Sequence, residues 1–282
     1  MRPSSLAVIG LGAIGGSLAW QARLAGIGRV VGYSPSRAEG VAALRAAAVS
    51  EVADSPVRAA RGAELVVLAV PPAPTLDLIG RLGSCLEPGA VLTDVCSVKA
   101  PVMARAADCG LGDRFVGAHP LAGTHDSGFP AARPDRLRGC VVYVCEGPSH
   151  DSARTARSVM RFWEEVLEAH PVLISADDHD RQLAWTSHLP QAVAYALAKA
   201  LADRRLGGVS YGTGARDTTR LAASSPDMWL DILLQNGDPL VDALASVEAR
   251  LGELRRLIES RDRERLEQYL EAARDFRHGL DR

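Results

Sequence analysis

A histidine stands at the end of an apolar run, and its imidazole could do chemistry. The stretch FVGAHPLAG (residues 115–123) predicts a strand that ends at His119, because Pro120 stops it. A buried structural histidine needs hydrogen-bond partners for both ring nitrogens. A histidine at a strand end of an α/β protein is also placed to face a ligand, and a reference pKa of about 6.5 suits a general base. His119 is therefore either a satisfied structural histidine or a catalytic base.

Three glycines follow the first apolar run with the spacing G-x-G-x-x-G, in VIGLGAIGGSLA. Such a loop allows a tight turn, lets a pyrophosphate approach the backbone, and lets the following helix pack on the strand. The motif alone is weak, but its place in the first βαβ unit predicts dinucleotide binding rather than a plain tight turn. The expected cofactor contacts are Gly10, Gly12, Ala13, Ile14 and Gly15, with Val70 and Pro71 after a later strand.

The end of the second predicted strand bears on the choice between NAD and NADP. NAD enzymes usually carry an acidic residue there for the ribose hydroxyls. This chain has Ser34, Ser36 and Arg37 in YSPSRAEG, with no carboxylate expected to repel a 2′-phosphate. A guanidinium pairs well with phosphate, so the sequence favours NADP over NAD. The alternative is that Arg37 is a solvated residue in the first turn of a helix.

The bulk composition is typical of a soluble globular protein of one or two domains. Of 282 residues, 47% are hydrophobic and 23% are charged, and the formal net charge is −2. This balance argues against a nucleic acid or an anionic membrane as partner. No apolar run is long enough to span a bilayer, and the N-terminus enters a strand directly, unlike a signal peptide. Five cysteines without a C-x-x-C pair indicate a reducing cytoplasm and no zinc site.

Apolar strands alternate with helical segments up to about residue 175. Most of the strands lack polar alternation, as expected when both faces are covered. They are predicted at 6–10, 29–33, 65–70, 90–95, 114–118, 140–145 and 171–175, with helices at 13–25, 36–47, 74–83, 98–108 and 150–167. The fold class is therefore α/β, with a doubly wound Rossmann-type parallel sheet that forms a dinucleotide-binding domain over residues 1–175.

From residue 176 the sequence is helical. The first long helix begins with DDHD (177–180), and the helix dipole explains these acids without a metal ion. Pro190 is expected to kink this helix. In the tail, apolar residues recur at helical spacing at positions 240, 244, 247, 251, 254 and 258. Residues 176–282 are thus predicted to form an all-α substrate and dimerisation domain, whose excess apolar surface favours a homodimer.

Seven segments, taken in order, resemble a known family. They are GLGAIGGSLA, TDVCSVK, VGAHPLAGTHDSG, DDHD, SHLPQ, GTGARDTTRLA and PDMWLDILLQN. Together they cover essentially the whole chain and resemble the prephenate/arogenate dehydrogenase family of tyrosine biosynthesis. The resemblance implies NAD(P)-dependent oxidative decarboxylation of prephenate to 4-hydroxyphenylpyruvate, or of arogenate to tyrosine. No pattern of a fused chorismate mutase or of an appended ACT domain is found.

The resemblance also implies roles for individual residues. His119 would hydrogen-bond the C4 hydroxyl of the substrate and accept its proton, while Ser97 would hold His119 or the hydroxyl in register. The alternative for Ser97 is an N-cap of the helix at 98–108. Arg220 would bind the ring carboxylate, the alternative being a surface pair with Asp217. The other substrate-binding residues implied are Thr124, His125, Asp126, His188, Gln191, Thr213 and Trp229.

Several of these positions keep alternatives. His125 and Asp126 stand where several family members have a glutamate, and Gln191 stands where many have a histidine. These side chains are expected to line the substrate's side chain, so the preference for prephenate or arogenate stays open. Trp229 is either a residue that reaches the partner's site or a core or dimer-interface aromatic, and His188 either touches the site or packs within its helix.

Two other functions compete with the family's reaction. One is a β-hydroxyacid dehydrogenase or imine reductase with a similar domain plan. The other is a non-catalytic nucleotide-binding sensor. The dehydrogenases of the first kind share the early glycines, but HPLAG followed by RDTTR is not their pattern. The sensor would need the cofactor loop but not His119 and Arg220 together.

Overall fold

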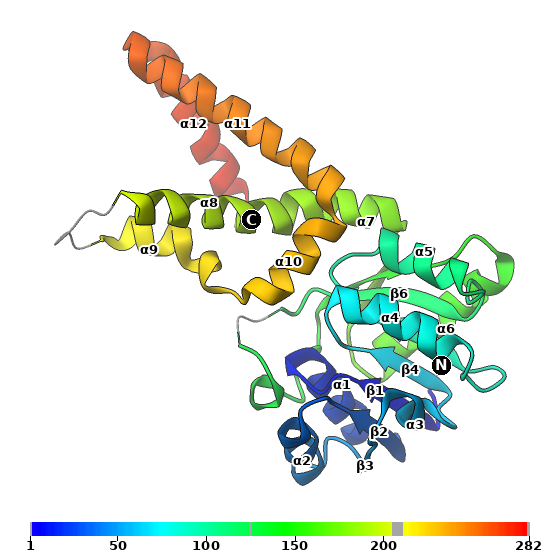
Figure 1. The fold of residues 1–282 in the computed structure, drawn as a ribbon. Coiled ribbons are helices and arrows are strands. Elements are labelled where there is room, and N and C mark those ends of the chain that lie inside the picture. Colours follow the sequence, from blue (N-terminus) through cyan, green and yellow to red (C-terminus); the bar gives the residue numbers. More distant parts are fainter. Residues whose placement is uncertain (1, 124–125, 205–210, 281–282) are drawn as a thin grey trace. The chain divides into compact units, whose positions relative to one another are not determined.

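An eight-stranded sheet organises the first half of the protein (Figure 1). The computed structural model describes residues 2–123, 126–204 and 211–280. The order across the sheet is β3-β2-β1-β4-β5-β6-β7-β8. The strands are β1 (Ser5–Ile9), β2 (Arg29–Tyr33), β3 (Glu51–Val52), β4 (Leu65–Leu68), β5 (Val91–Asp94), β6 (Phe115–Pro120), β7 (Val141–Cys145) and β8 (His170–Leu173).

The sheet is parallel except for the pair β6 and β7, which is antiparallel with His119 opposite Tyr143. The predicted α/β class is therefore confirmed, but the sheet is mixed. A parallel neighbour needs a crossover connection, usually a helix. Between β6 and β7 the described chain has only the 3₁₀ turn Phe129–Ala131, so β7 starts at the edge where β6 ends.

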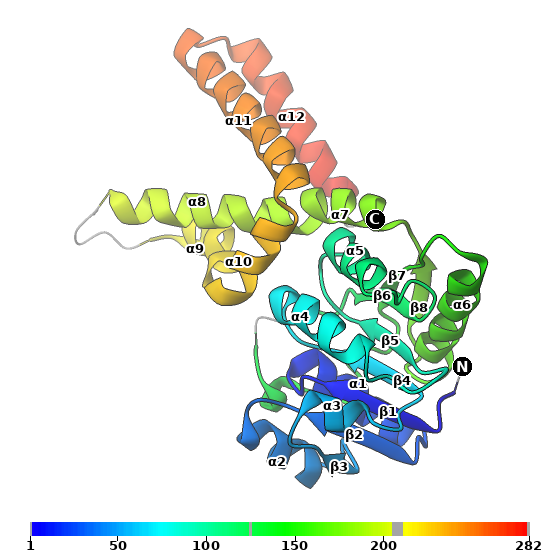
Figure 2. The ribbon, with the colours of Figure 1, turned by 45° about the vertical axis from the view of Figure 1, so that its right-hand side comes forward.

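Helices cover both faces of the sheet (Figures 1 and 2). Leu65 and Val67 of β4 join one hydrophobic core, whereas Val66 and Leu68 join the core on the other face. This explains why the strands lack polar alternation in sequence. The helices of this half are α1 (Ala13–Leu24), α2 (Arg37–Arg45), α3 (Pro56–Ala60), α4 (Pro72–Gly83), α5 (Ala100–Asp108) and α6 (His150–Glu165).

Besides the 3₁₀ turn at Phe129–Ala131, a short strand and a short helix of this half were not predicted. Strand β3 has only two residues, both exposed, and helix α3 has five, so neither carries a periodic apolar pattern. Helix α5 begins at Ala100 rather than at residue 98, with Pro101 in its first turn, where the missing N–H of proline is tolerated.

A second set of helices follows β8. They are α7 (Ala176–Leu183), a π-helical turn (Ala184–His188), α8 (Leu189–Asp203), α9 (Thr213–Thr219), a 3₁₀ turn (Arg220–Ala223) and α10 (Pro226–Gln235). The predicted kink at Pro190 is replaced by the π-helical turn, which ends two residues before it. In Figures 1 and 2, α7 and α8 continue along nearly one direction. The turn places the position without an N–H at the start of α8.

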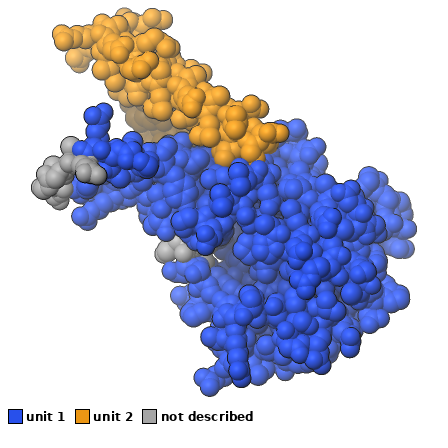
Figure 3. Space-filling model, viewed as in Figure 1, with its two compact units in different colours: residues 1–236 blue, residues 237–282 orange. Residues whose placement is uncertain are grey.

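Residues 237–282 form a separate compact unit, coloured apart from residues 1–236 in Figure 3. It consists of α11 (Gly237–Ser260) and α12 (Arg263–Gly279), and Asp262 caps the N-terminus of α12. Tyr269 donates its hydroxyl hydrogen to the carbonyl of Arg250, at 3.2 Å, which joins the two helices. Leu251 and Ile258 of the apolar series in α11 are 60% and 57% exposed. None of the helices described has the length and hydrophobicity to cross a membrane.

Candidate active site

The glycine loop between β1 and α1 has the geometry that each of its glycines requires. Gly10 has a φ of +102°, and a Cβ there would lie 2.2 Å from the carbonyl oxygen of Ala69. A Cβ on Gly15 would lie 2.0 Å from the carbonyl oxygen of Gly10. By contrast, a Cβ on Gly12 would meet no described atom within 4 Å. The loop is therefore closed on the protein side and open where a pyrophosphate approaches.

The first turn of α1 is suited to an anion. Gly12 is the N-cap, no side chain caps the helix, and no acidic residue lies in its first turn. Ala13 and Ile14 are partly exposed there. The free N–H groups and the helix dipole favour a phosphate. Val70 and Pro71 follow β4, the strand that pairs with β1, so they border the same loop.

The sequence predicted no carboxylate at the end of β2, but the structure places the carboxylate of Glu39 there. Ser34 donates its hydroxyl hydrogen to Oε2 of Glu39, at 2.6 Å, and Ser36 caps α2 by accepting from the N–H of Glu39. The spacing Ser36-x-x-Glu39 is a capping-box pattern, which could have indicated that Glu39 turns back toward the strand end.

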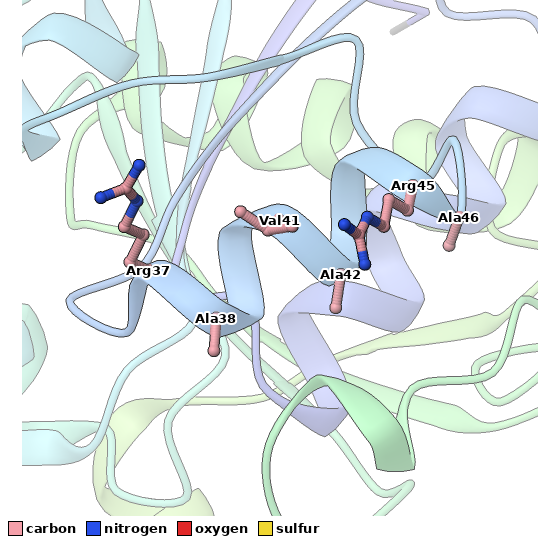
Figure 4. A pocket seen from close by; sticks show the side chains of 6 residues that line it. All are labelled: Arg37, Ala38, Val41, Ala42, Arg45 and Ala46. Carbon is pink, nitrogen blue, oxygen red and sulfur yellow. The ribbon is translucent and has the colours of Figure 1, made fainter.

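A cleft of about 440 Å³ lies at this strand end. Ser34, Ser36, Arg37 and Asp54 are among the residues that line it. Arg37 is exposed, and Figure 4 shows its side chain at the start of α2, one end of a second hollow that also includes Arg45. The adenosine ribose of the coenzyme is expected at this strand end. One cation, Arg37, and two carboxylates, Glu39 and Asp54, are therefore present there.

His119 is half-buried in β6 and its ring is held by a second histidine. Nδ1 of His119 lies 2.9 Å from Nε2 of His179, and Nδ1 of His179 lies 2.7 Å from Oδ1 of Asp180. The Asp180 carboxylate accepts from the backbone N–H groups of Lys99 and Ala100, at 2.7 and 2.8 Å. It therefore caps the N-terminus of α5, and a continuous hydrogen-bonded chain runs from α5 to His119.

Burial keeps these imidazoles neutral. Burial is the main cause that lowers the pKa of His119 well below its usual value, and His179 and Lys99 lower it further. Burial also lowers the pKa of His179, although its hydrogen bond to Asp180 opposes the shift. Both rings are therefore uncharged near pH 7, the state in which an imidazole accepts a proton.

A buried ion pair holds the strand ends around His119. Lys99 and Asp94 pair with both side chains fully buried, and Oδ1 of Asp94 accepts from the N–H of Ala118 at 3.1 Å. Cys96 lies beside them, and burial raises the pKa of its thiol to about 12, which makes it inert.

Ser97 is half-buried, and the described chain shows no hydrogen bond between its hydroxyl and His119. The residue that holds His119 is His179, and in the described part of the chain the Ser97 hydroxyl forms no hydrogen bond. The N-cap alternative is wrong, because α5 begins three residues later with Lys99 as its N-cap. A role for Ser97 toward the substrate stays a prediction.

The 3₁₀ turn that carries Arg220 is tied to α8. Nε2 of Gln191 donates to the carbonyl of Leu221 at 2.6 Å, and the hydroxyl of Tyr195 donates to the carbonyl of Ser224 at 3.1 Å. Gln191 is buried. Arg220 is exposed, and among the residues described no ion pair joins it to Asp217 or to another acid. No contact in the described chain joins Arg220 to His119, so their convergence stays a prediction.

His188 is completely buried and its ring meets Trp229 edge-on, with centroids 6.0 Å apart. Nδ2 of Asn236 donates both to the carbonyl of Asp180 and to Nδ1 of His188, at 2.8 and 2.9 Å. Burial lowers the pKa of His188 to about 4. Nε2 of His188 and Nε1 of Trp229 are buried without a hydrogen-bond partner in the described chain. Trp229 packs against His188 in the described chain, and its role toward the partner's site stays a prediction.

The remaining predicted substrate residues are less informative. Thr124 and His125 lie outside the described residues. Asp126 is exposed, and Thr213 is the exposed first residue of α9. Within the described ranges, no group of three or more histidines, cysteines or acids is arranged to hold a metal ion.

Six residues of these networks were not predicted as functional, namely Glu39, Asp94, Lys99, His179, Asp180 and Asn236. The helix dipole accounts for the acids of DDHD, including Asp180, and the sequence predicted no separate role for His179. The one available sign was that Leu183 follows His179 by four residues, which puts His179 on the buried face of α7.

Comparisons with known proteins agree on one family. Residues 18–172 match the family model "Prephenate dehydrogenase, nucleotide-binding domain", and residues 175–272 match "Prephenate dehydrogenase, dimerization domain". The chain is 34% identical to a prephenate dehydrogenase of Bacillus subtilis (98% of this chain, 76% of that protein). It is 32% identical to a cyclohexadienyl dehydrogenase of Zymomonas mobilis (98% and 95%). The crystal structure of an Aquifex aeolicus prephenate dehydrogenase with hydroxyphenyl propionate and NAD+ superposes with a TM-score of 0.90, at 29% identity and 98% coverage of both chains.

Proposed function

Because this chain belongs to the prephenate dehydrogenase family, we propose that it catalyses the NAD(P)-dependent oxidative decarboxylation of prephenate, arogenate or both. The observation that carries the proposal is the neutral imidazole of His119, at the carboxyl end of β6 in a sheet whose first strand ends in the open Gly12 loop. Ligands of such sheets bind outside the carboxyl ends of the strands.

The reaction needs three events at one ring. The C4 hydrogen leaves as hydride, and the bound coenzyme supplies the acceptor. The C4 hydroxyl loses its proton to His119, and the bond to the ring carboxylate breaks to release CO2 while its electron pair makes the ring aromatic. The protein therefore mainly has to orient the ring and hold one base against one hydroxyl.

Arg220 is the proposed partner of a substrate carboxylate. Its guanidinium is exposed and has no acid partner in the described chain, so it is available for a bidentate pair. Ser97 is proposed to hydrogen-bond the C4 hydroxyl. The buried donors on His188 and Trp229 are proposed to face the substrate's side chain, with Gln191 supporting the turn that carries Arg220.

The coenzyme is proposed to bind through Gly10, Gly12 and Gly15 and the first turn of α1, with its adenosine ribose at Ser34 and Ser36. NADP stays the proposed preference, because Arg37 can pair with a 2′-phosphate. Glu39 opposes this preference, since its carboxylate is held at Ser34, where it would repel that phosphate. We therefore expect a moderate preference rather than an exclusive one.

The proposed roles of the two domains correspond to the two family models. Residues 1–175 are proposed to bind the coenzyme, and residues 176–282 to complete the substrate site and form a homodimer. The match of residues 175–272 to a dimerization domain supports this division.

The deciding experiment is kinetics on four combinations of prephenate or arogenate with NAD or NADP. Reduced-nicotinamide absorbance reports hydride transfer, and CO2 release reports decarboxylation. We expect both signals in equal amounts for at least one combination. Their absence in all four would end the proposal.

A further inference from the structure

The donor and the acceptor of each hydrogen bond at Asp180 can be assigned, and this assignment determines which nitrogens of His179 and His119 carry hydrogen. A backbone N–H can only donate, and two of them, from Lys99 and Ala100, point at separate oxygens of the Asp180 carboxylate. Asp180 is only 3% exposed, so little water competes for these oxygens. The carboxylate therefore acts as an acceptor toward its remaining neighbour, His179.

This direction passes from one imidazole to the next. Because Oδ1 of Asp180 accepts, Nδ1 of His179 carries a hydrogen. A neutral ring has only one N–H, so Nε2 of His179 is a bare acceptor. Its neighbour at 2.9 Å, Nδ1 of His119, must then carry the hydrogen of that contact. The other nitrogen of His119, Nε2, is left without a hydrogen.

We propose that Asp180 and His179 are positioning residues that set the tautomer of His119, so that its Nε2 is the bare atom that takes the substrate's hydroxyl proton. This inference rests on the proposed function of His119. When His119 becomes protonated, its Nδ1–H still donates to His179, and the chain of donors ends on a carboxylate. Burial is the main effect that opposes a positive charge on His119, and His179, Lys99 and His188 oppose it further.

Asn236 sets the opposite tautomer in a neighbouring ring. Its amide NH₂ donates to the carbonyl of Asp180 and to Nδ1 of His188, so the hydrogen of neutral His188 must be on Nε2. The contacts of His179 and Asp180, in one turn of α7, therefore leave Nε2 of His119 as an acceptor, and Asn236 leaves Nε2 of His188 as a donor.

The substitution Asp180→Asn tests the direction itself. An amide offers one oxygen and one NH₂, so it cannot accept from both backbone N–H groups and also from His179. Where its NH₂ takes the place of Oδ1, the oxygen that Lys99 and His179 both contact, both tautomers reverse and Nε2 of His119 carries a hydrogen. We expect kcat to fall by roughly 10²–10⁴, as in hydrolases whose carboxylate–imidazole pair is changed in this way, with KM within about threefold of wild type. The matched control is Asp178→Asn, which removes an exposed acid from the same helix and should leave kcat within about twofold.

A second pair of variants covers the case in which Asp180→Asn does not fold. His179→Gln keeps one acceptor toward His119 and one donor toward Asp180, so it should retain about a tenth of kcat or more. His179→Leu keeps neither and should fall as far as Asp180→Asn. Equal kcat in the Gln and Leu variants would overturn the proposal.

Nitrogen-15 NMR of histidine-labelled protein reads the tautomer without any turnover. The His119 signals are assigned by their loss in His119→Asn. In the wild type we expect a hydrogen on Nδ1 and none on Nε2, and the reverse in Asp180→Asn. A hydrogen on Nε2 of wild-type His119 would overturn the inference. The expected tautomer in a protein inactive on all four combinations would instead refute the proposed function alone.

Discussion

Asp94 and Lys99 form an ion pair in which neither side chain is accessible to solvent. Asp94 ends β5 and accepts from the N–H of Ala118, next to His119, whereas the backbone N–H of Lys99 donates to Asp180. The pair therefore connects both sides of His119, through the strand that carries it and through the carboxylate that is hydrogen-bonded to His179.

Removing one partner should destabilise the fold strongly, because it leaves a buried charge without compensation. We expect Lys99→Met to lower the free energy of unfolding by about 3–5 kcal/mol in urea titrations. Lys199→Met, which breaks the exposed pair with Asp203, should lower it by less than about 1 kcal/mol. Similar losses in the two variants would contradict the importance of burial.

Loss of the base should affect the chemical step and not the coenzyme. We expect His119→Asn to lower kcat by roughly 10²–10⁴, the usual contribution of a general base. The coenzyme Kd, measured by fluorescence titration, should be unchanged. His170→Asn, at the exposed start of β8, serves as the control. A near-normal kcat in His119→Asn would return His119 to a structural role.

Arg220 should act on substrate binding. We expect Arg220→Gln to raise KM, with a loss of about 2–4 kcal/mol for a charge-assisted pair, while kcat changes less. Arg216→Gln removes another exposed cation, from the preceding helix, and should change KM by less than about threefold. Steady-state kinetics that show the same KM for both variants and the wild type would exclude Arg220 as the carboxylate ligand.

Coenzyme selectivity should respond in opposite directions to two residues of α2. Glu39→Gln should raise kcat/KM for NADP relative to NAD, because a negative charge near the 2′-phosphate is removed. Arg37→Gln should lower this ratio, and Arg45→Gln on the same helix should not change it. Exposed charges act weakly, so the changes should be about three- to fivefold. A fall of the ratio in Glu39→Gln would place the ribose elsewhere.

His188 should make stability depend on pH. Its pKa is about 4 in the folded protein and about 6.5 in the unfolded chain, so the unfolded state binds more protons between these values. The stability that this ring contributes is complete above pH 6.5 and is lost as the pH falls toward 4, on the order of 3 kcal/mol. Urea midpoints of the wild type and His188→Gln should therefore converge as the pH falls. Parallel pH profiles would show that His188 does not titrate in this range.

Much of the fold was predictable because its determinants are local. Continuous apolar runs indicated strands covered on both faces, and the spacing of Gly10, Gly12 and Gly15 predicted a closed turn, an open approach and a close helix contact. The conformations and distances at these glycines confirm that pattern. The antiparallel direction of β7 was missed, because it depends on the path of the loop that connects β6 to β7. The two-residue strand β3 was missed because it is too short to show a periodic pattern.

The sequence alone determined the α/β architecture, the glycine loop and, through its ordered motifs, the family, since each depends on residues close together in the chain. Only the tertiary structure decided which side chain orients His119. His179 and Asp180 are about 60 residues from it along the chain, and the hydrogen bonds between them exist only once α7 packs beside β6 and α5. Hydrogen-bond direction depends on atoms within 3 Å of one another, and no spacing in the sequence encodes a distance between segments so far apart.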